Sequence, residues 1–69
     1  MPVTDVDQAM DRVYSPSGGT ATFHTEADAE KFMELVHEKY PAMGYGTNTI
    51  MLREGLTTFN VTWYVGRAD

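Results

Sequence analysis

The residues best suited to chemistry in this chain are carboxylates and an imidazole within one predicted helix. Glu34 and His37 form a Glu-x-x-His pair, the spacing with which di-iron helical bundles supply ligands in paired copies. The pair occurs once here, and such centres need further carboxylates from other helices. We therefore expect no metal site and no cofactor, and we interpret the pair as part of a solvated helix face.

Two further motifs resemble ligand sites only in part. His24 stands at the end of a predicted strand, but a general base there would need a substrate pocket, which so thin a domain can hardly enclose. Gly44, Tyr45 and Gly46 lack the lysine and the helix start of a phosphate loop, so we interpret them as a tight turn that displays Tyr45. With no catalytic set in view, we expect a protein without enzymatic activity.

Glu26, Glu30, Glu34 and Glu38 follow one another at four-residue intervals, and we call them the glutamate ladder. Each like-charge pair at this spacing costs an isolated helix about 0.2–0.5 kcal/mol, so folding alone does not call for the ladder. It presents carboxylates at steps of about 6 Å. Two interpretations stay open: a solubilising helix face, or an acidic surface that imitates nucleic acid locally and binds a basic protein, with Tyr45 nearby.

The charge and composition narrow the classes of partner. Ten acidic against five basic side chains give a net charge of -5. Because the basic residues are scattered, direct binding to nucleic acid is not expected, whereas a protein partner with a basic surface is favoured. The chain has no cysteine, no signal-peptide pattern in residues 1–15 and no apolar run near the roughly 20 residues that span a bilayer. We expect a cytoplasmic protein without membrane contact.

One helix is strongly predicted, from Thr25 to Tyr40. Thr25 is a suitable N-cap, and Pro41 disfavours helical geometry in the residue before it, so the helix should end at about Tyr40. Apolar residues recur at spacings of three and four and form one stripe. The stripe consists of Ala29, Phe32, Met33, Val36 and Tyr40. The glutamate ladder lies on the solvent side of this helix.

Two-residue alternation predicts the strands. The segments Thr47–Arg53 and Thr58–Val65 should form an antiparallel hairpin, and Thr20–His24 is a third strand. Ser15–Gly19 is interpreted as a loop, which connects to a short fourth strand at Arg12–Ser15.

These elements predict a single α+β domain over residues 1–69, a three- to four-stranded antiparallel sheet with one helix packed on one face. For residues 1–11, a short helix capped by Thr4 and a flexible arm remain alternatives. The expected core is Phe23, Ala29, Phe32, Met33, Val36, Tyr40, Ile50, Leu52, Phe59, Val61, Trp63 and Val65.

One helix covers a strip about 10 Å wide, so part of the sheet should remain open. The strand Thr58–Val65 carries no charge, and at a sheet edge it would invite pairing with another chain. An alternative function follows: a homodimeric structural or assembly protein, paired through this strand and without catalytic activity.

The segment 25–32 (TEADAEKF), then Tyr40–Pro41, then 44–47 (GYGT) and a terminal hairpin with Phe59 and Trp63 resemble small uncharacterised accessory proteins of tailed bacteriophages over residues 22 to 65. The resemblance implies a protein that binds and inhibits a host enzyme or defence complex in the host cytoplasm. The leading hypothesis is therefore a small acidic protein-binding module that inhibits or modulates a host nucleic-acid-handling or defence protein through the glutamate ladder and Tyr45.

Overall fold

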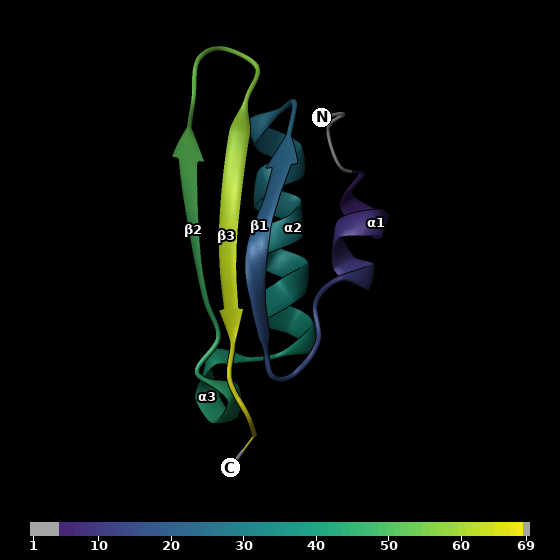
Figure 1. The fold of residues 1–69 in the computed structure, drawn as a ribbon, viewed down its shortest axis with the longest axis vertical. Helices are drawn as coiled ribbons and strands as arrows, with labels where there is room; N and C mark the ends of the chain where they lie inside the picture. The colour runs from purple at the N-terminus through teal and green to yellow at the C-terminus, as the bar shows by residue number, and fades with distance from the viewer. Residues whose placement is uncertain (1–4, 69) are drawn as a thin grey trace.

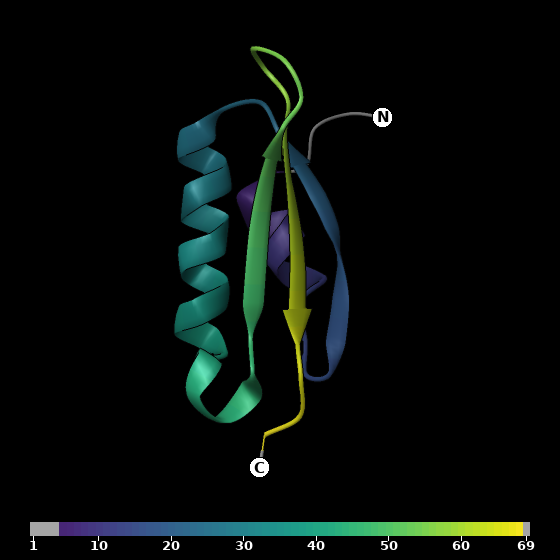
Figure 2. The same ribbon diagram turned by 90° about the vertical axis from the view of Figure 1, so that its left-hand side faces the viewer.

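In the computed structural model, which describes residues 5–68, three strands form one antiparallel sheet and a 14-residue helix packs along one of its faces (Figure 1, Figure 2). The elements in chain order are α1 (Val6–Asp11), β1 (Ser17–Phe23), α2 (Glu26–Lys39), α3 (Ala42–Tyr45), β2 (Asn48–Arg53) and β3 (Phe59–Val65). The predicted α+β class and the antiparallel sheet with a helix on one face are confirmed.

The order of the strands in the sheet is β1-β3-β2. β3 is central, and it pairs antiparallel with β1 from Ser17↔Val65 to Phe23↔Phe59 and with β2 from Asn48↔Tyr64 to Arg53↔Phe59. The predicted pairing of Thr58–Val65 with another chain required a position at a sheet edge, and the segment does not lie at one. Because both sides of β3 are already paired, a second chain cannot add to this strand.

Helix α2 begins and ends where its local signals indicate. The hydroxyl of Thr25 accepts a hydrogen bond from the Asp28 N–H at 3.1 Å, which satisfies one of the free donors of the first turn. The last helical residue is Lys39. Tyr40 leaves helical geometry (φ -132°, ψ 83°), as expected for a residue that precedes proline.

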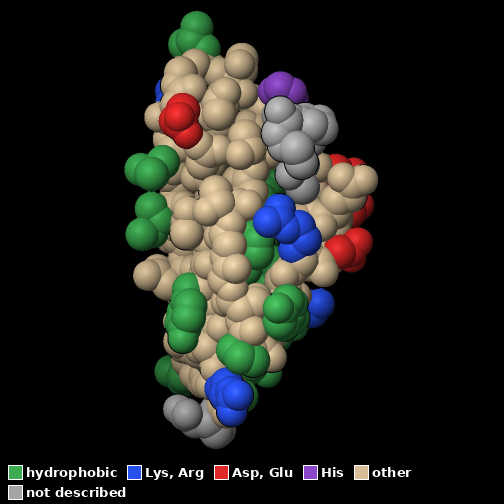
Figure 3. Space-filling model, viewed as in Figure 1, with side chains coloured by type: hydrophobic (Ala, Val, Ile, Leu, Met, Phe, Trp, Pro, Cys, Tyr) green, Lys and Arg blue, Asp and Glu red, His purple; other side chains and the backbone are tan. Residues whose placement is uncertain are grey.

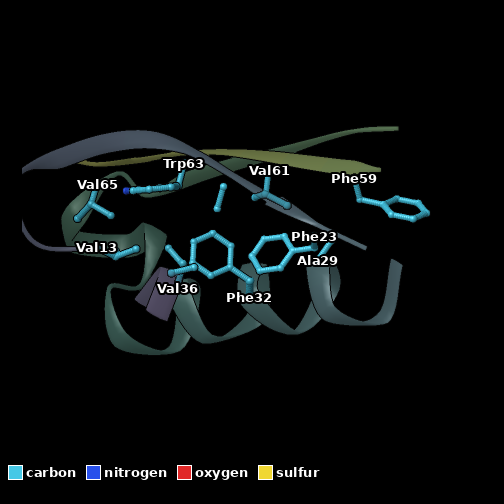
Figure 4. Close-up of a cluster of buried hydrophobic side chains, with 11 residues drawn as sticks. Val13, Phe23, Ala29, Phe32, Val36, Phe59, Val61, Trp63 and Val65 are labelled. Atoms are coloured by element: carbon cyan, nitrogen blue, oxygen red, sulfur yellow. The ribbon is translucent and has the colours of Figure 1, made fainter. Parts of the chain in front are cut away.

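The core lies between α2 and the inner face of the sheet (Figure 4). The Phe32 ring packs at 5.2 Å from the Phe23 ring and edge-on at 5.5 Å from Trp63, so aromatic contacts join the helix to two strands. Met33 and Tyr40 are partly buried against this core. The buried hydrophobic residues are Ala9, Val13, Ala21, Phe23, Ala29, Phe32, Val36, Phe59, Val61, Trp63 and Val65.

The prediction that Ile50 and Leu52 belong to the core is wrong. Their side chains are 56% and 63% exposed. The register explains this, because Met51 pairs with the buried Val61 while Ile50 pairs with the exposed Thr62, and directly paired residues point to the same face. Three consecutive apolar residues, Ile50 to Leu52, do not indicate by themselves which face is buried.

The N-terminal segment is a docked helix rather than a flexible arm within the described residues. Ala9 and Val13 are buried, and α1 packs against α2 on the β1 side of the molecule (Figure 1). The N-cap is Asp5, whose carboxylate accepts a hydrogen bond from the Asp7 N–H at 3.0 Å. The predicted cap, Thr4, lies outside the described residues.

The predicted fourth strand at Arg12–Ser15 is wrong, since these residues connect α1 to β1 and the sheet of residues 5–68 has three strands. Conversely, β1 begins at Ser17, inside the segment interpreted as a loop. Gly19 stands there for a packing reason, because the Trp63 ring occupies the space that a Cβ would need.

Candidate protein-binding surfaces

All four residues of the glutamate ladder are exposed. They lie outside the buried stripe of Ala29, Phe32 and Val36. The helix is anchored through that stripe, so the carboxylates are displayed from a backbone that the core holds in place. The sequence-based placement of the ladder on the solvent side is confirmed.

The orientation of the ladder relative to the sheet follows from His37. Its Nε2 lies 3.0 Å from Thr49 Oγ1, so this flank of α2 faces β2. Glu30 precedes His37 by seven residues, which is almost two helical turns. The two side chains therefore point in directions that differ by about 20° around the helix axis. The ladder thus starts on the β2 flank of α2 and winds away from the sheet toward Glu38.

Glu34 and His37 lie in different environments. The His37 ring is half-buried and bonded to Thr49, while Glu34 is exposed. Within residues 5–68, no three side chains of His, Cys, Asp or Glu come together in a way that could hold a metal ion.

Tyr45 lies at one end of the molecule, after the C-terminal end of α2. Its ring packs edge-on against Tyr40 at 5.1 Å, and its carbonyl accepts a hydrogen bond from the Gly66 N–H at 2.9 Å. It also lines an open pocket of about 430 Å³ together with Ala42, Gly44, Gly46, Tyr64, Gly66 and Arg67.

Tyr45 can share a continuous surface with only part of the glutamate ladder. Glu26 and Glu38 are twelve residues apart, which corresponds to about 18 Å along the helix. Tyr45 follows the end at which Glu38 stands, so it can adjoin only that end of the ladder. Gly44 and Gly46 have positive φ angles of 105° and 67°, so the chain does bend here, but Tyr45 is half-buried against the core and is not displayed as predicted.

A second surface, not predicted from the sequence, is the sheet face turned away from α2, which we call the open face (Figure 3). Ile50, Leu52 and Tyr64 are more than half exposed on it. Polar pairs accompany them: the Thr20 and Thr62 hydroxyls lie 3.1 Å apart, as part of the cross-strand pairing of β1 with β3. The alternate polar residues of β3 could have predicted this face, because side chains of a neighbouring strand that lie opposite these polar residues must be on the same exposed face.

The two edge strands of the sheet, β1 and β2, differ in what lies beside their outer backbone groups. On the β1 side, Arg12 donates a hydrogen bond from its guanidinium to the Thr20 carbonyl at 3.3 Å, and the same group lies 5.4 Å from the centre of the Trp63 ring. On the β2 side, no helix of the described residues lies over the outer edge (Figure 2). The β1 edge therefore has one backbone carbonyl already bonded and α1 nearby, whereas the β2 edge is uncovered.

No protein-family model, curated protein or solved structure matches this chain. Among the described residues, no helix has the length and apolar character needed to cross a membrane. The two surfaces are therefore the observations on which a functional proposal can rest.

Proposed function

We propose that this protein is a small acidic protein-binding module that acts through the glutamate ladder and has no catalytic activity. The observation that carries the proposal is the exposure of all four carboxylates along one anchored helix. Their mutual repulsion disfavours the helix, and their side chains are not needed to fill the core. A helix face that costs folding free energy and remains accessible is suited to attract a partner of opposite charge.

The proposed partner is a host protein with a basic surface, of the kind that handles nucleic acid or takes part in defence. A surface that binds phosphates is rich in Lys and Arg, and carboxylates spaced at about 6 Å along α2 can occupy such a surface over a short stretch. The resemblance to accessory proteins of tailed bacteriophages supports inhibition of a host protein in the cytoplasm as the biological setting.

Two charge-matched variants test the proposal. The ladder variant replaces Glu26, Glu30, Glu34 and Glu38 with Gln. The control variant replaces four exposed acidic residues elsewhere, as Asp7→Asn, Asp11→Asn, Asp28→Asn and Glu54→Gln. Both change the formal charge from -5 to -1, because each removes four negative charges.

The tagged native protein is first used to capture a partner from bacterial lysate, and the affinity of both variants for that purified partner is then measured. We expect the ladder variant to lose binding, the control variant to retain it, and salt to weaken the native complex, because exposed charges are screened beyond about 8 Å at physiological ionic strength. Equal loss in both variants would reduce the effect to net charge, and unchanged binding by the ladder variant would end the proposal.

A further inference from the structure

The outer edge of β2 presents backbone groups at alternate residues. The Glu54 N–H donates to the Thr58 carbonyl at 2.8 Å, so these two residues are a hydrogen-bonded pair at the end of the β2–β3 ladder. In antiparallel pairing the hydrogen-bonded residues alternate with residues whose backbone groups point the other way. The N–H and C=O groups of Thr49, Met51 and Arg53 therefore point outward from the sheet.

The same alternation at β1 gives a different result. Because the even-numbered residues of β3 bond to β2, its odd-numbered residues bond to β1, and the groups of Gly18, Thr20 and Thr22 point outward. The Thr20 carbonyl already accepts the hydrogen bond from Arg12, and α1 stands on this side (Figure 1). An edge that is left open, as β2 is, is a template for a further strand.

We propose that β2 pairs antiparallel with β2 of a second copy, about a two-fold axis at Met51, and joins the two sheets into one six-stranded sheet. The proposal does not require the glutamate ladder to bind a partner, although it brings the second copy close to Glu30 and Glu34. It replaces the predicted dimer through Thr58–Val65, which the central position of β3 excludes. The outward groups of Met51 would bond to those of the same residue in the second copy.

The register follows from the faces of the strand. Along β2, even-numbered side chains lie on the open face and odd-numbered ones on the face toward α2. Residues that lie opposite each other in the two copies must therefore both be even or both be odd. An axis at Met51 meets this condition. It places Ile50 opposite Leu52 of the second copy, and Leu52 opposite Ile50. Four side chains that are each more than half exposed in the single chain then form one apolar cluster on the open face.

The charges of β2 favour a copy of this same chain as the occupant. The chain as a whole carries a net charge of -5, yet β2 has no acidic residue and one basic residue, Arg53. The register places Arg53 opposite Thr49 of the second copy, which is the residue that contacts His37 on the flank of α2. Glu34 precedes His37 by about one turn and Glu30 by about two. Each Arg53 is thus brought to the acidic flank of the opposite helix, where opposite charges attract.

The first measurement is the mass of the native protein by sedimentation and light scattering, from micromolar to millimolar concentration. We expect a reversible dimer of twice 7.7 kDa. Amide hydrogen exchange followed residue by residue should show protection of the N–H groups of Thr49, Met51 and Arg53 that increases with concentration. A monomer at every concentration would overturn the proposal and would leave the edge open to an extended segment of another protein.

Two variants locate the interface. Ile50→Lys combined with Leu52→Lys places like charges opposite each other at both apolar pairs, and both positions are exposed in the single chain, so the fold should persist while the mass falls to that of a monomer. Met51→Pro removes an N–H that the single chain does not use and should have the same effect. Far-ultraviolet circular dichroism checks that both variants remain folded.

The matched control is Met43→Lys combined with Leu56→Lys, which changes the net charge equally at two exposed positions outside β2. This variant should remain a dimer. Its dissociation to the same extent as the β2 double variant would overturn the proposal, since charge alone would then explain the effect. Concentration-dependent protection of Gly18, Thr20 and Thr22 in place of the β2 amides would overturn it as well, because the dimer would then form through β1.

Discussion

The indole ring of Trp63 lies so close to Gly19 that a Cβ on the glycine would be 2.9 Å from the nearest ring carbon. The ring is also confined on other sides, edge-on to Phe32 at 5.5 Å and with the Arg12 guanidinium 5.4 Å from its centre. It cannot move away from β1 without losing these contacts. Gly19 therefore fixes how closely β1 and the Trp63 side chain can pack.

Gly19→Ala should lower the free energy of unfolding by about 1–3 kcal/mol, the usual cost of overpacking a core. Urea denaturation followed by circular dichroism measures the change. The same substitution in a Trp63→Phe background should cost less, because the smaller ring leaves room for the added methyl group. Equal costs in the two backgrounds would show that the contact with the ring is not the cause.

Arg12→Ala should increase the access of solvent to Trp63, the single tryptophan of the chain. Removal of the guanidinium takes away a cation–π contact, for which we expect a loss of about 0.5–1 kcal/mol in stability, and it uncovers one side of the ring. Acrylamide quenching of the fluorescence should rise. The control is Arg53→Ala, which removes a similar contact over Phe59 at 5.4 Å and should leave the quenching of Trp63 unchanged.

The exposure of β2 predicts unequal costs for two apolar strand residues. Ile50→Thr should change the free energy of unfolding by less than about 0.5 kcal/mol, because the Ile50 side chain is mostly in solvent. Val61→Ala should cost about 2 kcal/mol, since Val61 is fully buried. Both are measured by urea denaturation at low protein concentration. Similar costs for the two would contradict the register of the sheet.

Thr25→Ala should destabilise the protein by about 0.5–2 kcal/mol through loss of the N-cap of α2. Thermal denaturation of the variant against the native protein measures the effect. Thr25→Ser retains a hydroxyl that can accept from the Asp28 N–H and should keep most of the stability. A serine variant as unstable as the alanine variant would mean that the methyl group of Thr25, rather than its hydrogen bond, matters.

The elements that the sequence predicted well are those with local signals. The cap at Thr25, the apolar stripe of α2 and Pro41 all act within a few residues of the chain, so they define the helix without knowledge of the rest. β3 was predicted for the same reason, because its alternation is continuous from Phe59 to Val65. Predicting the solvent-facing glutamate ladder required only the helical period.

The errors concern relationships between distant segments. Whether Ile50 or Met51 faces the core depends on the pairing of β2 with β3, and the central position of β3 depends on which strands pair with it. Neither is encoded within a single strand. The strand that contains Gly18 and Gly19 was missed because glycine usually indicates a loop, whereas here it provides room for Trp63.

The two candidate surfaces also differ in whether local signals predict them. The acidic face of α2 was predictable from spacing alone. The open face and the uncovered edge of β2 arise only when three strands are assembled in a definite order and α1 settles beside one edge, so no spacing rule within β2 could predict them.

The connection between β2 and β3 extends beyond the helix at one end of the molecule (Figure 1). Its two ends are joined by the hydrogen bond from Glu54 to Thr58, Gly55 has a φ of 92°, and the Leu56 side chain is 85% exposed. Lengthening a connection whose ends are already held together costs little free energy, because closure entropy grows slowly with loop length. A peptide epitope or a cysteine for dye attachment can therefore be introduced between Gly55 and Leu56, where it would report on this protein in cells while leaving both termini unmodified.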